Sequence, residues 1–101
     1  MSNDEKKPEL RIVEMEDKEK SYSKELLGKT IVSKAGKKFG EVGDLIFEVG
    51  SGELIHLQLR NPTSYIDRME LEKTKEGSIL IPFSAVIASG DFIVVAEEDI
   101  L

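Results

Sequence analysis

His56, the one histidine of the chain, is the first candidate for chemistry, because imidazole is a common acid–base group and metal ligand. The 101 residues include 20 Asp and Glu residues but no cysteine, which excludes disulfides, thiolate metal sites and cysteine nucleophiles. No second histidine and no carboxylate at ligand spacing accompanies His56. The sequence also lacks a phosphate-binding loop and a Gly-x-Gly-x-x-Gly motif. We therefore expect no catalytic residue, no metal site and no cofactor, and we interpret the chain as a non-enzyme.

The charge balance argues against nucleic acids and anionic membranes as partners. Lys and Arg number 14 against 20 acidic residues, a formal net charge of −6. Phosphate backbones and acidic lipids attract clustered cations, which this chain lacks. No apolar run is long enough to cross a bilayer, and the first residues lack the apolar core of a signal peptide. We expect no nucleic-acid binding, no membrane insertion and a cytoplasmic location.

Residues 1–22 form the first of two expected regions, a flexible charged arm. A segment of this composition buries too little apolar surface to offset the entropy lost on ordering. Within it, Leu10, Ile12, Val13 and Met15 form a short apolar island between charged residues. The island is either a linear motif that docks on a partner protein or a segment that folds back on the same chain. Either arrangement would satisfy the same hydrophobic drive.

Residues 23–101 form the expected folded domain, in which short apolar runs alternate with turn residues. Residues 53–60 alternate between apolar and polar side chains, as a half-buried strand does, and this pattern places His56 on the polar face. We expect glycines at turns or sharp bends, namely Gly28, Gly36, Gly43, Gly52 and Gly90. Strands this short, with turns this close, indicate an all-β fold, either an antiparallel barrel or a sandwich.

Residues 61–76 interrupt the run of strands. Asn61-Pro62 ends the preceding strand, and a short helical turn is expected in which Tyr65, Ile66 and Met69 share a face. The segment is either a loop that closes one end of the barrel or a variable insertion that gives partner specificity.

Several expected strands are apolar on both faces, most clearly residues 79–81 and 92–95. A sheet with one solvated face should alternate, and a small barrel has only one interior. We therefore expect an outer apolar face that binds a second copy through a two-fold contact. The candidate interface residues are Leu80, Ile93, Val95, Ile31 and Val86. The opposite strand phase would exchange the inner and outer sets, and the arm or residues 61–76 could instead cover this face.

The order of these motifs resembles the PRC-barrel family. The motifs are Leu26-Leu27-Gly28-Lys29, Phe39-Gly40-Glu41-Val42-Gly43-Asp44, Ile81-Pro82-Phe83-Ser84-Ala85-Val86 and Gly90-Asp91-Phe92-Ile93-Val94-Val95. The resemblance extends from about Ser23 to Glu97 and is greatest to short archaeal members. It implies a small antiparallel β-barrel.

The resemblance also implies a function. Archaeal single-domain members act in cell division, where they bind SepF, the membrane anchor of FtsZ, and one another. By this resemblance the chain would be a dimeric adaptor, recruited to midcell, whose partner is SepF or another PRC-barrel protein. The alternative is a ribosome-maturation role like that of RimM, in which the barrel binds a ribosomal protein; the acidic charge argues against direct RNA binding but not against a basic protein partner.

Overall fold

Seven strands, connected by short turns and 3-10 helices, form one sheet in residues 23–100, the part of the chain that this computed structural model describes. The strands are β1 (Thr30–Ser33), β2 (Lys38–Phe47), β3 (Leu54–Arg60), β4 (Glu72–Lys73), β5 (Ile79–Pro82), β6 (Val86–Ser89) and β7 (Phe92–Val95). The 3-10 helices are η2 (Ser64–Ile66), η3 (Phe83–Ala85) and η4 (Glu97–Asp99). The expected arm, residues 1–22, lies outside the described residues.

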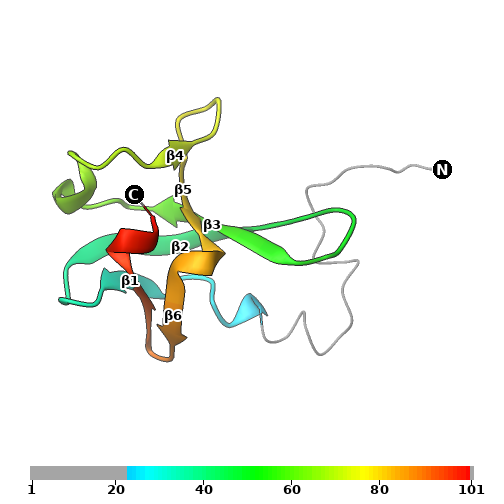
Figure 1. Cartoon of the computed structure of the whole chain (residues 1–101), viewed down its shortest axis with the longest axis horizontal. Coiled ribbons are helices and arrows are strands. Elements are labelled where there is room, and N and C mark those ends of the chain that lie inside the picture. The colour runs from blue at the N-terminus through cyan, green and yellow to red at the C-terminus, as the bar shows by residue number, and fades with distance from the viewer. Residues whose placement is uncertain (1–22, 101) are drawn as a thin grey trace.

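The sheet curls around a single core and has the order β4-β5-β3-β2-β1-β7-β6 (Figure 1). This arrangement confirms the expected all-β, barrel-like fold, although the described strand pairs do not close the sheet. All the neighbouring pairs are antiparallel except β1 and β7, which run parallel with Ile31 opposite Ile93. The parallel pair was not expected, because it joins two segments about sixty residues apart, a separation that local turn signals do not report.

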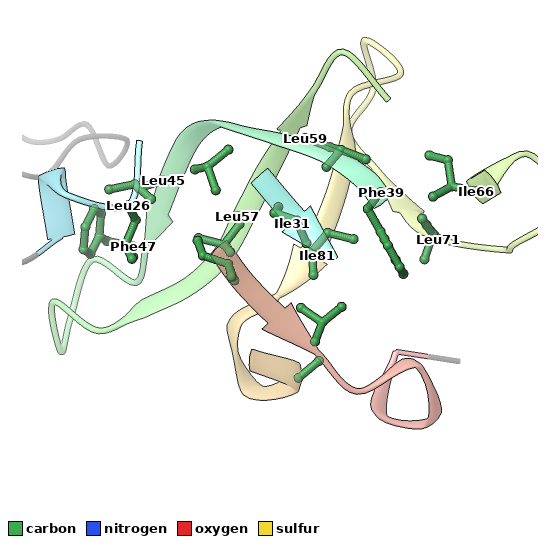
Figure 2. Packing of buried hydrophobic residues seen from close by; sticks show 14 residues of the cluster. Leu26, Ile31, Phe39, Leu45, Phe47, Leu57, Leu59, Ile66, Leu71 and Ile81 are labelled. Carbon is green, nitrogen blue, oxygen red and sulfur yellow. The ribbon is translucent and has the colours of Figure 1, made fainter. Parts of the chain in front are cut away.

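The interior is filled by apolar side chains from every long strand (Figure 2). The most deeply buried large side chains are Phe39, Ile31, Leu57, Ile81, Ile93, Val42 and Val95. Three of these, Ile31, Ile93 and Val95, were expected on the outer face, and their complete burial corrects that expectation. The reason is the register: Ile31 and Ile93 face each other across the parallel pair and enter the core together.

The other two expected interface residues are also covered, although Leu80, unlike its neighbour Ile81, is not part of the core cluster. Leu80 is only 7% exposed, and Val86 is half-buried and packs against the core. Because Ile93 and Val95 are buried, strand β7 has the opposite phase to the one that placed these two residues outside. The large side chain that this phase leaves outside is Phe92.

The β2–β3 hairpin is the longest element and extends beyond the rest of the sheet (Figure 1). Gly43 lies inside β2, at an irregularity of the ladder between Val42 and Asp44, rather than at a turn between strands. A Cβ added to Gly43 would lie 2.8 Å from the Cβ of Arg60 on β3. The sharp bend expected at Gly43 is thus a bulge that requires close approach of the two backbones.

The other expected glycine turns fall between elements. Gly28, Gly36 and Gly52 have φ values of 83°, 86° and 75°, in the region that favours glycine. Gly90 lies in the β6–β7 turn, where its N–H donates to the Phe92 carbonyl over 2.9 Å.

Residues 61–76 pack against the core. Asn61 begins the segment with a positive φ of 52°, a conformation that asparagine tolerates. Ile66 of η2 and Leu71 are buried in the core, whereas Tyr65 is exposed and its ring lies 5.7 Å from that of Phe39. The burial of these two side chains favours the structural interpretation of the segment.

Candidate interaction surfaces

The outer side of β1, β7 and β6 carries a set of apolar side chains that we call the outer apolar face. Its residues are Val32, Ile87, Ala88, Phe92 and Val94. Val94 lies opposite Val32 on one side and Ala88 on the other, so these three form a row across the sheet. Phe92 is 54% exposed and Ile87 52% exposed. Phe92 lies on the side of this row toward the β6–β7 turn, and Ile87 lies on the side away from it.

A bulge in the edge strand places Ile87 and Ala88 on the same side of the sheet. Strand β6 lies at one edge of the sheet, and its register with β7 shifts between Val86 and Ala88. Val86 packs against the core and its neighbour Ile87 is exposed, as alternation along a strand requires, and the shift then keeps Ala88, opposite Val94, on the same outer side as Ile87. A bulge at a sheet edge twists the edge and hinders strand addition there. The geometry therefore favours contact through the outer apolar face rather than through the strand edge.

Charges of both signs border the outer apolar face. The Lys29 ammonium group donates to the Gly90 carbonyl over 2.5 Å and so ties the start of β1 to the β6–β7 turn. Asp91, in the same turn, is exposed. A border with both signs can complement itself when two copies meet through a two-fold axis.

A second surface feature is a shallow groove of about 530 Å³ beside the projecting hairpin. We call it the hairpin groove, and its walls are Glu53, Leu54, Ile55, Phe83 and Ser84. Ile55 has the same strand parity as the buried Leu57, yet it is 37% exposed. The exposure arises at a bulge: the register with β2 shifts between Ile46 and Phe47, so Leu54 pairs with Phe47 and packs against the core while Ile55 does not.

The polar side chains with shifted pKa values form hydrogen bonds between segments that are distant in the sequence. Glu41 of β2 accepts hydrogen bonds from the Asn61 amide at 3.2 Å and from the Arg60 guanidinium at 3.3 Å. These two hydrogen bonds lower the pKa of the Glu41 carboxyl, and the Asn61 bond has the larger effect. The cluster fixes the backbone where β3 turns into residues 61–76.

The C-terminal 3-10 helix is tied to the barrel in the same way. The Tyr65 hydroxyl donates to Glu97 over 2.5 Å, and this bond raises the pKa of Tyr65. The Lys34 ammonium group donates to Glu98 over 2.7 Å, which raises the pKa of Lys34 and lowers that of Glu98. Each of these carboxylates therefore already has a structural partner.

His56 has a partner that the sequence did not reveal. Its Nε2 lies 3.1 Å from Oε1 of Glu72, across the intervening strand β5. Sixteen residues separate the two in sequence, so only the strand order brings them together. In residues 23–100 no group of three or more His, Cys, Asp or Glu side chains is arranged to hold a metal ion.

Of the other expected site residues, Leu10, Ile12, Val13 and Met15 lie outside the described residues. In the described part of the chain no helix is both long and apolar enough to span a membrane.

Comparison with known proteins gives one family. The model of the PRC-barrel domain matches residues 18–99. No curated protein matches the chain.

Proposed function

This chain belongs to the PRC-barrel domain family, and from this premise we propose that it is a non-catalytic protein-interaction module that works as a dimeric adaptor. The observation that carries the proposal is the outer apolar face, where Phe92 and Ile87 are each about half exposed on adjacent strands. Large apolar side chains grouped on an exterior surface are typical of protein interfaces.

The first partner on this face is a second copy of the chain. Closing the face against its own image removes Phe92 and Ile87 from water in both copies, and a closed two-fold contact is the commonest symmetric assembly. Each large side chain contributes roughly 1.5–3 kcal/mol when fully buried, and about half of each is already covered in the monomer. Association costs an estimated 4–15 kcal/mol, so the dimer is expected to be weak and to dissociate on dilution.

The adaptor role we propose is in archaeal cell division, with SepF or another PRC-barrel protein as partner and recruitment to midcell. Its support is the likeness of the motifs to short archaeal members of the family. An alternative is binding to a ribosomal protein, as in ribosome maturation. The net charge of −6 favours that alternative, because it would attract a basic partner.

Binding to purified SepF from the source organism tests the division role. We expect titration calorimetry with the full chain to give saturable binding, with Phe92→Asp weakening it at least tenfold. Val49→Asp is the matched control, because Val49 is 59% exposed but lies at the hairpin tip away from the outer apolar face. Absence of SepF binding, with co-sedimentation on the small ribosomal subunit instead, would overturn the division role in favour of the alternative.

A further inference from the structure

The hairpin groove lies between two segments that are distant in the sequence. One wall consists of Glu53, Leu54 and Ile55 at the start of β3, and the other consists of Phe83 and Ser84 in η3. Strand β3 and η3 contact each other, and Leu54 and Phe83 also pack against the core. Both walls therefore belong to the packed barrel, and their three apolar side chains form a preformed surface.

A partner can reach this groove with side chains but not with an added strand. The bulge between Ile46 and Phe47 interrupts the ladder at this end of β3, and the pairing of β3 with β5 ends at His56. The remaining edge, Leu54 and Ile55, is too short for a row of backbone hydrogen bonds. Binding here therefore depends on burying Ile55, which is 37% exposed, and on the charges of the walls.

The charged side chains of the two walls are all negative. Residues 39–59, which contain the hairpin, include four carboxylates and no lysine or arginine, and residues 78–90, which contain η3, include no charged side chain. Glu53 lines the groove, and Glu48 is exposed on the paired strand, where its N–H donates to the Glu53 carbonyl over 2.8 Å. His56 follows Ile55 and so faces the opposite side of β3. The groove therefore combines apolar walls with a negative potential, which attracts a cation.

The shape of the groove favours a protein over a small molecule. Its volume of about 530 Å³ has room for more than one side chain, but the groove is shallow and open. A small ligand would therefore keep much of its surface in water, whereas a protein covers the walls and their rim together. The complement of these walls is an apolar side chain that lies next to a cation.

We propose that the hairpin groove binds an exposed apolar side chain of a partner protein, flanked in that protein by lysine or arginine. The proposal rests on the proposed role as an interaction module and adds a second surface to it, because no groove residue belongs to the outer apolar face. A dimer joined through the outer apolar face would present two such grooves, one in each copy. An adaptor that joins two copies of a basic partner needs this arrangement.

Titration of the isotope-labelled full chain with short peptides, followed by NMR, tests the proposal. The probe is a blocked peptide of alternating leucine and lysine. One control peptide has serine in place of leucine, and the other has glutamate in place of lysine. We expect the probe to give saturable shifts of the amide signals of Glu53, Ile55 and Ser84, and added salt to weaken its binding. Each control peptide should bind at least tenfold more weakly.

Matched variants of the chain separate the apolar contact from the charge contact. Ile55→Ser should weaken probe binding about fivefold or more, whereas Val49→Ser, at the hairpin tip outside the groove, should leave it unchanged. Glu53→Gln should weaken binding about threefold and reduce its salt dependence, whereas Glu76→Gln, in the β4–β5 turn, should do neither. All four positions are exposed, and circular dichroism checks that each variant is folded.

Three results would overturn the proposal. Equal binding of the probe and either control peptide would show that the groove does not select an apolar side chain next to a cation. Shifts centred on other carboxylates, such as Glu97–Asp99, would show that the peptide binds through net charge alone. Groove signals that move with chain concentration in the absence of peptide would assign the groove to a second copy. Phe92→Asp should bind the probe as the native chain does, so a failure of the proposed dimer and a failure of this site give different results.

Discussion

Phe92 and Ile93 are consecutive residues of β7 with opposite environments: Phe92 is 54% exposed, whereas Ile93 is completely buried. The parallel pairing of β7 with β1 produces this contrast, because it places Ile93 opposite Ile31 inside the core and leaves Phe92 opposite Thr30 on the outside. The larger of the two apolar side chains is therefore the one in contact with water. Ile93 therefore stabilises the fold, whereas Phe92 is available to a partner protein.

Replacing Ile93 with aspartate should unfold the domain. The carboxylate would lie among apolar side chains with no cation to pair with it, a cost on the order of 4 kcal/mol or more. Phe92→Asp, one residue away, should keep the native fold because position 92 is solvated. Urea unfolding followed by circular dichroism measures both variants. A folded Ile93→Asp protein with native stability would contradict the assigned strand phase.

Gly43→Ala should destabilise the hairpin. The added Cβ would lie 2.8 Å from the Arg60 Cβ, so the β2 and β3 backbones must separate, at an expected cost of about 1–3 kcal/mol. Gly50→Ala is the control, because a Cβ at Gly50 meets no atom within 4 Å and should change stability by less than about 0.5 kcal/mol. Equal unfolding midpoints for the two variants would argue against the close approach at Gly43.

The acid dependence of stability should include a contribution from Glu41. Hydrogen bonds from Asn61 and Arg60 hold the folded-state pKa of Glu41 below the ordinary value of a glutamate carboxyl. The resulting stabilisation is present above the unfolded-state pKa and is lost as the pH falls through the folded-state pKa. Glu41→Gln should therefore lower the melting temperature slightly at neutral pH and flatten its fall in acid. Thermal unfolding measured from neutral pH down into the acid range checks the prediction. Glu76→Gln, in an exposed turn, is the control. A Glu41→Gln profile parallel to that of the native chain would refute the contribution.

The strands and their alternation could be predicted from sequence, because side chains in a strand alternate between two faces. Which alternate set faces inward could not, since it depends on the pairing of Ile31 with Ile93 across most of the chain. The same limit applies to the candidate sites. Phe83 reaches the hairpin groove, and Glu72 reaches His56, only through the strand order. The bulge that places Ala88 beside Ile87 on the outer side left no local signal such as a glycine.

The most direct test of the account is the oligomeric state of the full chain and of Phe92→Asp, measured by sedimentation velocity between about 5 and 200 µM. If the outer apolar face joins two copies, the native chain should shift from monomer toward dimer as concentration rises. Phe92→Asp should remain a folded monomer, and Val49→Asp should behave like the native chain. A native chain that stays monomeric throughout, or a Phe92→Asp variant that dimerises as well as the native chain, would contradict the central claim.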